Sequence, residues 1–400
     1  MFYISNSPFP SNLAYATRTY YLCKLYEQLG YKVTIISAEG ISEDVRWLDI
    51  GSIKTKSFFP AINGWKMNLK SLFMGGSNLK KVLDKLSEEN PDIVIMGGGY
   101  TRLFIPVSEF CKRKQAKLII EFCEWFNMTQ FPLGILGPFY WDNRIVMKLL
   151  YKKADGIIAI SSYLEDYYNR LGKKTIRIPT ILDADYKIKI NKGIFNTCKL
   201  NIVYAGSLGK RKDMLQVIIG ALLKDPNLQK YIHLHIIGPS EQSINSLIKK
   251  TNKSYNNMSH CVTTYGKVSR EIALQYVSEA DFTILIREDT LNARAGFPTK
   301  VAESMLQGTP VITNITSDIG LYLKNMETGI VANGNTIDDV IDALKKAIEL
   351  NRSEIESMRN KCKIVARENF DYRVYIDKIK KFNSLINKSE DKLNEQNNNI

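Results

Sequence analysis

The feature that most constrains the fold of this chain is a repeated alternation of short apolar runs with longer amphipathic stretches. In the first 190 residues, apolar runs lie at 1–5, 32–37, 92–96, 117–121 and 156–160, and stretches with helical spacing lie at 14–29, 77–89, 104–114 and 164–170. A strand, a helix and another strand in succession are typical of a parallel sheet with helices on both faces. We therefore expect residues 1–190 to form a doubly wound, Rossmann-like α/β domain.

The same alternation restarts near residue 199, after the polar stretch 187–198. A second Rossmann-like domain is predicted over 198–368, followed by a helix over 369–386 that packs back toward the first domain. The Asn-rich residues 387–400 are predicted to be a disordered tail. Two such domains in tandem are expected to face each other across a cleft at the carboxyl ends of their strands, where ligands bind in open α/β sheets.

Composition excludes several classes of protein. The 400 residues carry 55 Lys and Arg against 41 Asp and Glu, a net charge of +14, which suits a nucleic acid, an anionic membrane or a phosphate-bearing small molecule. No apolar run is long enough for a transmembrane helix, and the N-terminus lacks the basic region of a secretory signal. Six cysteines without a CxxC pair and three histidines without zinc spacing predict no metal site.

The first informative motif is YAGSLGKRKDM at 204–214. Gly206 follows a predicted strand, and Lys210, Arg211 and Lys212 precede the next helix. Cations at such a point can neutralise a diphosphate, and arginine can bind it with two hydrogen bonds. The alternative is a solvated basic loop.

The second motif is RAGFPTKVAESMLQGTPVIT at 294–313. Gly296 allows a close approach of the backbone, Pro298 suits a first helical turn, and the start of the helix can bind an anion. Glu303 lies one turn after Lys300, so its carboxylate can accept hydrogen bonds from two adjacent ribose hydroxyls. The alternative is an ordinary loop and helix in which Glu303 pairs with Lys300. Neither the GxGxxG fingerprint nor the Walker motif is present, which disfavours NAD enzymes and P-loop NTPases.

These motifs occur in order with GPSEQ at 238–242 and TYGKVSREI at 264–272, and follow GYKVTIIS at 30–37, ADGIIAISSYLEDYY at 154–168 and IRIPTILDADY at 176–186. In this combination the chain resembles the retaining glycosyltransferases of the GT-B fold called family 4, or group 1. The resemblance implies transfer of a sugar from a UDP- or GDP-sugar to a glycan or lipid-linked acceptor with retention, and no cofactor. It also implies a cytoplasmic protein, peripheral on the inner face of the membrane, in bacterial capsule, exopolysaccharide or lipopolysaccharide biosynthesis.

The resemblance assigns roles to individual residues. Lys212 matches the residue that binds the donor diphosphate, and Glu303 matches the second Glu of the family's Glu-x7-Glu motif, which holds the ribose. The predicted catalytic residues are Lys212, Arg211, Arg287 and Glu124. The predicted donor-binding residues are Gly206, Ser207, Gly266, Lys267, Val268, Gly296, Phe297, Pro298, Thr299, Lys300 and Glu303. The first domain is expected to bind the acceptor through Asn12, Tyr15, Arg18 and Glu121.

The chain also departs from the family pattern. Ala295 stands where the first Glu of the motif belongs, Ser207 replaces the usual Arg, and residues 10–18 replace a Gly-Gly loop. No histidine precedes residue 233, so the histidine of many relatives has no counterpart. Arg287 and Arg294 are candidates to take over phosphate or sugar recognition, although Arg294 also fits a solvated loop.

The leaving diphosphate needs positive charge. The Asp183-Ala184-Asp185 sequence suits a turn better than a metal site, so we expect fixed cations and helix-end amides to stabilise the leaving group without a metal. The rivals are an epimerase of the same fold and a non-catalytic glycosyltransferase-like subunit, and no nucleic-acid-binding module accompanies the charge. Residues 1–195 carry +9 of the charge, including basic stretches at 111–117 and 147–153, which predicts an anionic membrane surface as a partner unless they are merely solvated.

Overall fold

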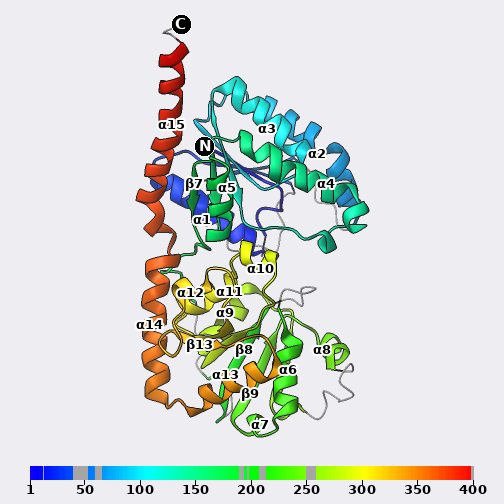
Figure 1. The fold of residues 1–400 in the computed structure, drawn as a ribbon, viewed down its shortest axis with the longest axis vertical. Helices are drawn as coiled ribbons and strands as arrows, with labels where there is room; N and C mark the ends of the chain where they lie inside the picture. Colours follow the sequence, from blue (N-terminus) through cyan, green and yellow to red (C-terminus); the bar gives the residue numbers. More distant parts are fainter. Residues whose placement is uncertain are drawn as a thin grey trace. The chain divides into compact units, whose positions relative to one another are not determined.

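The computed structural model describes residues 1–11, 13–38, 53–58, 65–188, 193–195, 198–206, 213–248 and 258–397, with backbone alone for 65–74 and 388–397. The chain divides into two compact units. Unit 1 comprises Met1–Ile181 and Tyr372–Ile400, and unit 2 comprises Leu182–Asp371. Each is a parallel sheet with helices, so the prediction of two α/β, Rossmann-like domains is confirmed (Figure 1).

Unit 1 is built on a seven-stranded sheet in the order β3-β2-β1-β4-β5-β6-β7, with every pair parallel. Its strands are β1 Phe2–Ser5, β2 Thr34–Ser37, β3 Lys54–Ser57, β4 Ile93–Gly97, β5 Lys117–Phe122, β6 Gly156–Ala159 and β7 Thr175–Arg177. Its longer helices are α1 Ala14–Gln28, α2 Trp65–Lys85, α3 Thr101–Lys114, α4 Pro138–Ile145, α5 Ser162–Arg170 and α15 Ile376–Asn397. Short turns η1 Met128–Gln130 and η2 Gly134–Leu136 precede α4, and a π-helical turn, Val146–Leu150, and a 3-10 turn, Tyr151–Lys153, follow it.

The strands of unit 1 are apolar on both sides because helices cover both faces of the sheet. Tyr3 and Ile95 face a core shared with α1 and α15, whereas Phe2 stacks on Phe110 of α3 at 6.0 Å between ring centroids. Figure 1 shows α1 and α15 on one side of this sheet and α2 and α3 on the other. α15 is thus part of the core of unit 1, although it is far from the rest of that unit in sequence.

Unit 2 has a six-stranded parallel sheet in the order β10-β9-β8-β11-β12-β13. Its strands are β8 Leu200–Ala205, β9 Ile232–Ile237, β10 Val262–Gly266, β11 Phe282–Leu285, β12 Val311–Asn314 and β13 Gly329–Ala332. Its helices are α6 Leu215–Lys224, α7 Leu228–Tyr231, α8 Glu241–Ile248, α9 Arg270–Glu279, α10 Leu291–Ala295, α11 Thr299–Leu306, α12 Ile319–Tyr322, α13 Ile337–Glu349 and α14 Arg352–Phe370.

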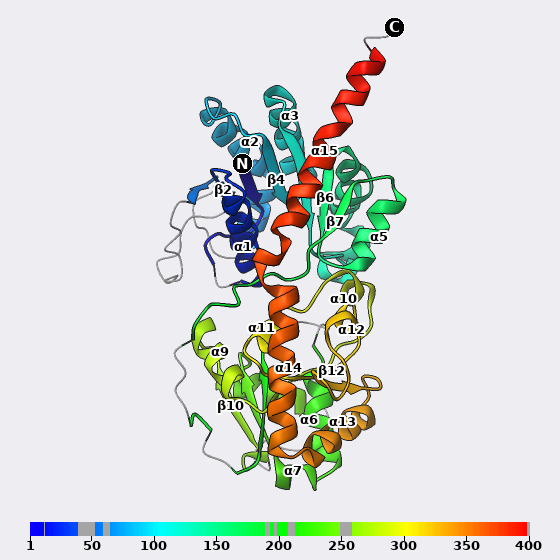
Figure 2. The same ribbon diagram turned by 90° about the vertical axis from the view of Figure 1, so that its left-hand side faces the viewer.

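The side chains of β8 alternate between two cores. Ile202 and Tyr204 pack with α6 and α13 in the larger core, and Val203 packs with Val277 of α9 in a smaller one. Figure 2 shows α14 running along unit 2 beside α11, which it contacts. The carboxyl ends of β8, β11 and β12, three neighbouring strands, therefore come to one edge of the sheet, with α9 and α11 packed beside it.

The boundary between the units differs from the sequence-based position in 187–198. Leu182 already belongs to unit 2, because its N–H donates to the carbonyl of Phe370 and it forms a β-bridge with Asp371. Asp183 and Asp185 form the predicted turn, in which the Asp185 N–H donates to Asp183 Oδ1 at 2.9 Å. The final helix, predicted to end at 386 before a disordered tail, continues to Asn397. None of the helices that the structure describes has the length and apolarity needed to cross a membrane.

Candidate functional site

Three glycines end neighbouring strands in unit 2. Gly206 follows β8, Gly238 follows β9, and Gly266 ends β10. The Gly206 N–H donates to Ile237 and the Gly238 N–H to Gly266, so the three backbones lie against each other. A Cβ on Gly238 would lie 2.1 Å from the carbonyl oxygen of Gly206, and one on Gly206 would lie 1.8 Å from Lys300 Nζ. The side chain of Lys300 crosses directly over Gly206, so any larger residue there would displace the end of this lysine.

Asp213 gathers the charged side chains beside these glycines. Its carboxylate pairs with Lys300 Nζ, accepts a hydrogen bond from the Tyr204 hydroxyl at 3.3 Å, and lies 3.7 Å from Arg287 Nε. Lys300 Nζ also sits 4.9 Å from the centroid of the Tyr204 ring. Burial, reinforced by the Asp213 charge, raises the pKa of Tyr204, so this phenol stays protonated and donates. Two cations thus converge at one edge of the sheet around one carboxylate.

Arg287 is the more constrained of the two cations. It is only 5% exposed. Its backbone N–H donates to the side-chain oxygen of Asn314 in β12, and the Asn314 amide donates to its carbonyl. Burial lowers the pKa of its guanidinium, although the nearby Asp213 charge acts in the opposite direction. Its Nε and Nη1 have no hydrogen-bond partner among the described residues. A buried guanidinium with unsatisfied donors is costly, and such groups are retained where a ligand supplies the acceptor.

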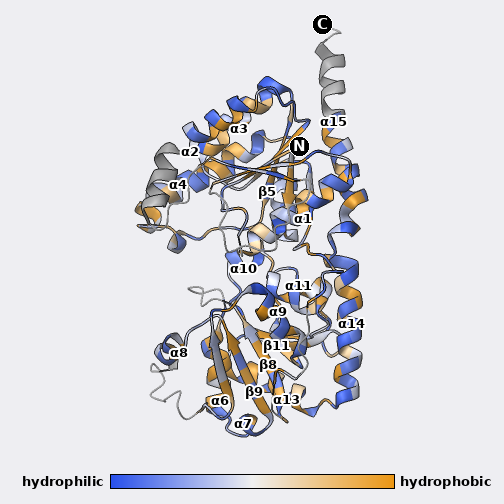
Figure 3. Ribbon diagram, turned by 180° about the vertical axis from the view of Figure 1, so that it is seen from behind, coloured by the Kyte–Doolittle hydropathy of each residue, from blue (hydrophilic) through white to orange (hydrophobic). Residues whose placement is uncertain are grey.

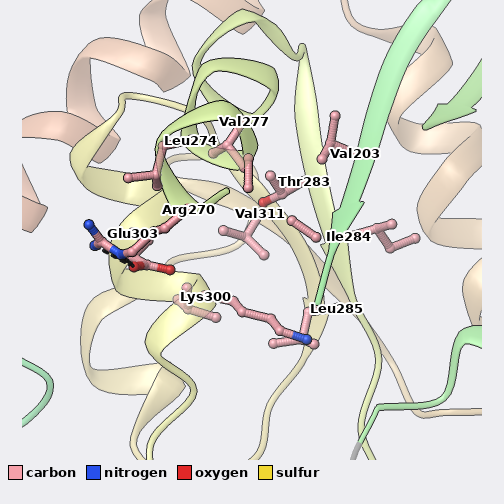
Figure 4. Close-up of a pocket in the computed structure, with 13 residues that line it drawn as sticks. Val203, Arg270, Leu274, Val277, Thr283, Ile284, Leu285, Lys300, Glu303 and Val311 are labelled. Atoms are coloured by element: carbon pink, nitrogen blue, oxygen red, sulfur yellow. Dashed lines mark hydrogen bonds and ion pairs between the residues drawn. The ribbon is translucent and has the colours of Figure 1, made fainter. Parts of the chain in front are cut away.

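Glu303 pairs with Arg270. It does not pair with Lys300, the partner expected if residues 294–313 were an ordinary loop and helix. Arg270 donates to Glu303 Oε1 from Nε at 3.1 Å and from Nη2 at 2.6 Å. Figure 4 shows these two side chains pointing toward each other, with Lys300 extending toward Leu285. All three line a cavity of about 60 Å³ with mostly apolar walls, including Val203, Leu274 and Ile284. The Glu303 side chain remains 21% exposed, and both hydrogen bonds from Arg270 go to its Oε1.

Phe297, in the segment before α11, anchors that segment by packing on other aromatic side chains. Phe297 is buried against Tyr322 and Phe370, so its backbone rather than its ring is available at the site. Pro298 is the N-cap residue of α11 rather than part of the first turn, and no side chain caps this helix. Within the described part of the chain, the first N–H groups of α11 receive no capping hydrogen bond from a side chain, and the helix dipole favours an anion at this end.

The remaining predicted donor residues divide into two groups. Gly266 adopts a φ of +65°, Lys267 is exposed and Val268 packs on the small core, all after the end of β10. Ser207, Arg211 and Lys212 lie outside the described residues, as does Asn12 of the predicted acceptor site. Arg294 pairs with Asp289 on the surface, where both side chains are more than half exposed, which matches the solvated-loop alternative.

In unit 1, two of the predicted acceptor residues are buried in the interior. Arg18 is 4% exposed; it donates to Glu121 Oε1 at 2.6 Å and to the carbonyl oxygens of Ile178 and Pro179. Glu121 also accepts a hydrogen bond from the buried Tyr3 hydroxyl. The prediction that Arg18 meets an acceptor is wrong, because its donors are occupied by the chain itself; its role is to hold Glu121 and the loop after β7.

Above this buried network lies a larger pocket of unit 1, about 440 Å³, at the carboxyl ends of β4 and β5. Tyr15 and Glu124, both predicted site residues, line it, and Glu121 forms part of its floor. Its walls are rich in aromatic side chains and glycine backbone: Gly97, Gly98, Gly99, Tyr100, Phe126, Phe131, Phe139 and Tyr151. The Tyr15 hydroxyl lies 2.9 Å from that of Tyr3 and so close to Gly97 that no side chain fits there.

The structure adds two residues that sequence reasoning did not select. Asp213 and Arg270 both stand inside motifs that were recognised, but nothing in local spacing says which side chains they meet. Asp213 is 87 positions from Lys300, and Arg270 is 33 positions from Glu303. Their pairing depends on the tertiary fold, which brings Asp213 and the start of α9 next to α11. Among the described residues, no group of three or more His, Cys, Asp and Glu side chains is arranged to hold a metal ion.

Two family models match the chain. The model described as Glycosyltransferase Family 4 matches residues 16–186, and the one described as Glycosyl transferases group 1 matches residues 199–349. This chain belongs to the group 1 glycosyltransferases. Both matched segments contain the motifs on which the sequence-based resemblance rested. The first covers most of unit 1 and runs a few residues into unit 2, and the second falls within unit 2.

Individual relatives of this glycosyltransferase are distant. An uncharacterised glycosyltransferase of Methanocaldococcus jannaschii is 24% identical over 258 residues, which cover 62% of this chain and 63%, less than two thirds, of that relative. HepE of Anabaena, crystallised with UDP and glucose, has a TM-score of 0.69 at 14% identity and covers 96% of this chain and 99% of its own. Sucrose-phosphate synthase of Thermosynechococcus elongatus has a TM-score of 0.71 at 14% identity, with 97% and 100% covered. These likenesses confirm the GT-B fold.

Proposed function

We propose that this glycosyltransferase transfers a sugar from a nucleotide-sugar donor, UDP- or GDP-linked, to a glycan or lipid-linked acceptor, with retention and without a metal ion. The observation that carries the proposal is the cation cluster of unit 2. Lys300 and the buried, incompletely satisfied Arg287 converge at the carboxyl edge of a parallel sheet, next to glycine backbone and the start of α11. HepE, of similar fold, has been crystallised with UDP and with UDP-glucose.

The proposed chemistry follows from charge. Breaking the bond between the anomeric carbon and the diphosphate oxygen leaves growing negative charge on the nucleoside diphosphate. Preorganised cations and helix-end N–H groups stabilise such charge without reorganising during the reaction. Arg287, Lys300 and the amides of Thr299 and Lys300 supply this here, and Lys212 and Arg211 are proposed to complete it. Diphosphate binding would free Lys300 and Arg287 from Asp213 and satisfy the open donors of Arg287.

Glu303 is proposed to hold the ribose of the donor. Its carboxylate is oriented by Arg270 on one side and open on the other, so it can accept hydrogen bonds from two adjacent hydroxyls. Residues 266–268, at the end of β10, are proposed to flank the nucleotide base.

The acceptor is proposed to bind in the aromatic pocket of unit 1. Sugar rings offer apolar faces that pack on aromatic side chains, with hydroxyls that need a few placed polar groups. Tyr15 and Glu124 provide such groups beside Phe126, Phe131 and Phe139. A role in bacterial surface polysaccharide synthesis, at the cytoplasmic face of the membrane, is supported by the similar fold of the lipopolysaccharide outer core galactosyltransferase WaaB. It has a TM-score of 0.62 at 16% identity and covers 95% of this chain and 98% of its own.

A panel of UDP- and GDP-sugars, with and without acceptor extracts, tests this proposal by release of nucleoside diphosphate and by thermal shift. Lys212→Ala is expected to lower turnover about 100-fold or more, since it removes a cation from the leaving group. Lys361→Ala, an exposed lysine on α14, serves as the matched control and should leave turnover unchanged.

Three results would contradict the proposal. A near-wild-type rate in Lys212→Ala would remove the assigned leaving-group site. Nucleotide binding without turnover for any sugar would indicate a non-catalytic subunit, and conversion of a nucleotide sugar to its epimer without acceptor would indicate an epimerase.

A further inference from the structure

A segment of unit 1 between β5 and β6, residues 128–149, exposes an unusual amount of apolar surface. Of the 19 large apolar side chains that are exposed in the described part of the chain, seven fall within these 22 residues. They are Met128, Leu133, Ile135, Leu136, Trp141, Ile145 and Leu149, which we call the apolar patch. Leu136 is 87% exposed and Leu133 77%, more than any other residue in that group. In the hydropathy colouring of Figure 3, orange marks the apolar residues around α4.

All of the patch except Met128 falls into two parts, a tip and a stripe. Leu133, Ile135 and Leu136 form the tip around η2. Trp141, Ile145 and Leu149 recur every four residues through α4 and the π-helical turn, so they lie along one side of this helical run. The opposite side is buried, through Asn143, Val146, Met147 and Tyr151. The exposed stripe is therefore an apolar face that the described residues of unit 1 leave uncovered.

Contacts with neighbouring side chains support the tip. The Trp141 indole N–H donates to the carbonyl of Ile135 at 2.8 Å, which ties η2 to α4. Behind it, Phe131 packs on Phe126 and Tyr140, and the Arg144 guanidinium lies 4.9 Å from the centroid of the Tyr140 ring. Leu133 is kept at a φ of +61°, a conformation that disfavours a leucine. A supported segment with a strained backbone thus exposes leucine side chains to solvent.

Cations border the stripe. Residues 128–153 contain Arg144, Lys148, Lys152 and Lys153 against the single acid Asp142. Lys148 and Lys152 are exposed and lie one helical turn apart, beside Ile145 and Leu149. Apolar side chains flanked by lysines suit the surface of an anionic bilayer. The acyl chains can accommodate the apolar side chains, and the anionic headgroups attract the lysines.

We propose that the apolar patch docks on the surface of an anionic phospholipid bilayer, with the tip inserted and the lysines among the headgroups. This inference deepens the proposed function and rests on it for the identity of the acceptor, because the same segment lines the aromatic pocket through Phe131, Pro132 and Phe139. Docking through this surface brings the pocket to the membrane, so the acceptor is carried by a membrane lipid.

Flotation of the full chain with vesicles tests the proposal. The chain is expected to bind vesicles of phosphatidylcholine with 30% phosphatidylglycerol, and to bind less as salt rises. The paired change Leu133→Asn with Leu136→Ser should weaken this binding at least about tenfold, since two inserted leucines are lost. The control pair Leu321→Ser with Ile364→Ser, which removes two apolar side chains of unit 2 that are each 58% exposed, should bind as the wild type does. Lys148→Gln with Lys152→Gln should lose the preference for the anionic lipid.

No binding of the wild-type chain to either vesicle would overturn the proposal, and so would an equal loss in the control pair. A shift from dimer to monomer in Leu133→Asn with Leu136→Ser, without a change in vesicle binding, would instead assign the patch to a second copy of this chain. Thermal stabilisation by UDP separates this test from the proposed function. A variant that no longer binds vesicles but is still stabilised by UDP has lost only the function of the apolar patch. If UDP does not stabilise the wild-type protein, the proposed donor site is wrong, whatever the vesicle result.

Discussion

Arg287 shows most clearly how this chain gives up stability at one residue. A guanidinium that is 5% exposed and lies 3.7 Å from its nearest carboxylate is poorly compensated for the water it has lost. Replacing such a group by an apolar side chain of similar length is often neutral or stabilising. Its retention therefore favours a role with a ligand over a role in folding.

We expect Arg287→Met to lower sugar-transfer turnover by about 100-fold or more, because it removes a fixed cation from the leaving diphosphate. The free energy of unfolding should stay unchanged or rise, since the buried charge disappears while Asp213 keeps Lys300. Steady-state kinetics and urea denaturation check the two halves. A protein that is destabilised and still active would show that Arg287 serves the fold instead.

Glu303→Gln tests the ribose contact. The amide keeps the shape of the side chain but loses the charge that orients Arg270 and accepts two hydroxyls. We expect the dissociation constant for the nucleoside diphosphate to rise about tenfold, corresponding to about 1.4 kcal/mol. Calorimetric titration measures it, and Glu271→Gln, an exposed neighbour on α9, is the control. Equal affinities in both variants would rule out the assigned contact.

His235 gives unit 2 a pH dependence that is separate from the site. Its ring is 3% exposed, lies between the Tyr265 hydroxyl and Asn201 Oδ1 at 3.0 Å each, and stacks near Phe195 and His233. Burial, with a smaller effect of His233, lowers its pKa to about 3. The folded state therefore holds the neutral ring, whereas the unfolded chain protonates near pH 6.5.

Because the folded pKa lies below the unfolded one, the contribution of His235 to stability is complete above about pH 6.5 and is lost as the pH falls toward 3. Between pH 7 and pH 5 this residue should remove about 2 kcal/mol from the free energy of unfolding of unit 2. In His235→Gln the loss over that interval should be smaller by the same amount, as measured by urea denaturation at both pH values. The exposed His260→Gln should keep the wild-type pH dependence.

At the scale of elements, α15 completes a domain that begins some 370 residues earlier. Ile379, Phe382 and Ile386 join the core beneath β1, β4 and β6. Gly156 of β6 has no side chain because a Cβ there would lie 2.5 Å from the Phe382 ring. The close packing of α15 on β6 thus requires a residue without a Cβ at position 156. This close packing makes the last helix structural rather than an appendage.

Phe382→Ala should therefore destabilise unit 1 by about 3–5 kcal/mol, because it leaves a cavity between α15 and the sheet. Leu385→Ala, three residues along the same helix but 52% exposed, should cost less than about 1 kcal/mol. Urea denaturation followed by tryptophan fluorescence reports the difference, since Trp125 is buried in unit 1. Similar losses in both variants would show that α15 does not pack as described.

At the scale of the whole molecule, two separate cores predict two unfolding steps. Each unit has its own parallel sheet and its own set of buried residues, so each can unfold as a unit. A ligand stabilises only the unit that binds it. UDP at 100 times its dissociation constant should raise the free energy of unfolding of unit 2 by about 2.7 kcal/mol and leave that of unit 1 unchanged.

Calorimetry with and without UDP checks this expectation, and the Phe382→Ala variant identifies which transition belongs to unit 1. If UDP raises the transition that Phe382→Ala lowers, the donor site has been assigned to the wrong unit. A single transition that moves as one would show that the units unfold together.

Much of this organisation could be predicted from the sequence, because the relevant signals are local. The period of the apolar pattern separates strands from helices, and most of the predicted elements begin and end near the observed residues. The helix expected over 14–29, for example, is α1 Ala14–Gln28. The short strands β3, β7 and β13 were not predicted. β3 reads Lys-Thr-Lys-Ser, and its strand character comes from pairing with β2 rather than from an apolar pattern.

The sequence by itself determined the class of each domain, the order of the motifs and the family, since all three are written in periodicity and spacing along the chain. Only the tertiary structure decided which side chains meet. It paired Glu303 with Arg270 instead of Lys300, buried Arg18 and Glu121 together, left two donors of Arg287 open, and placed α15 in the first unit. The physical reason is that such contacts depend on strand order and packing between distant segments, whereas local propensity acts only over a few residues.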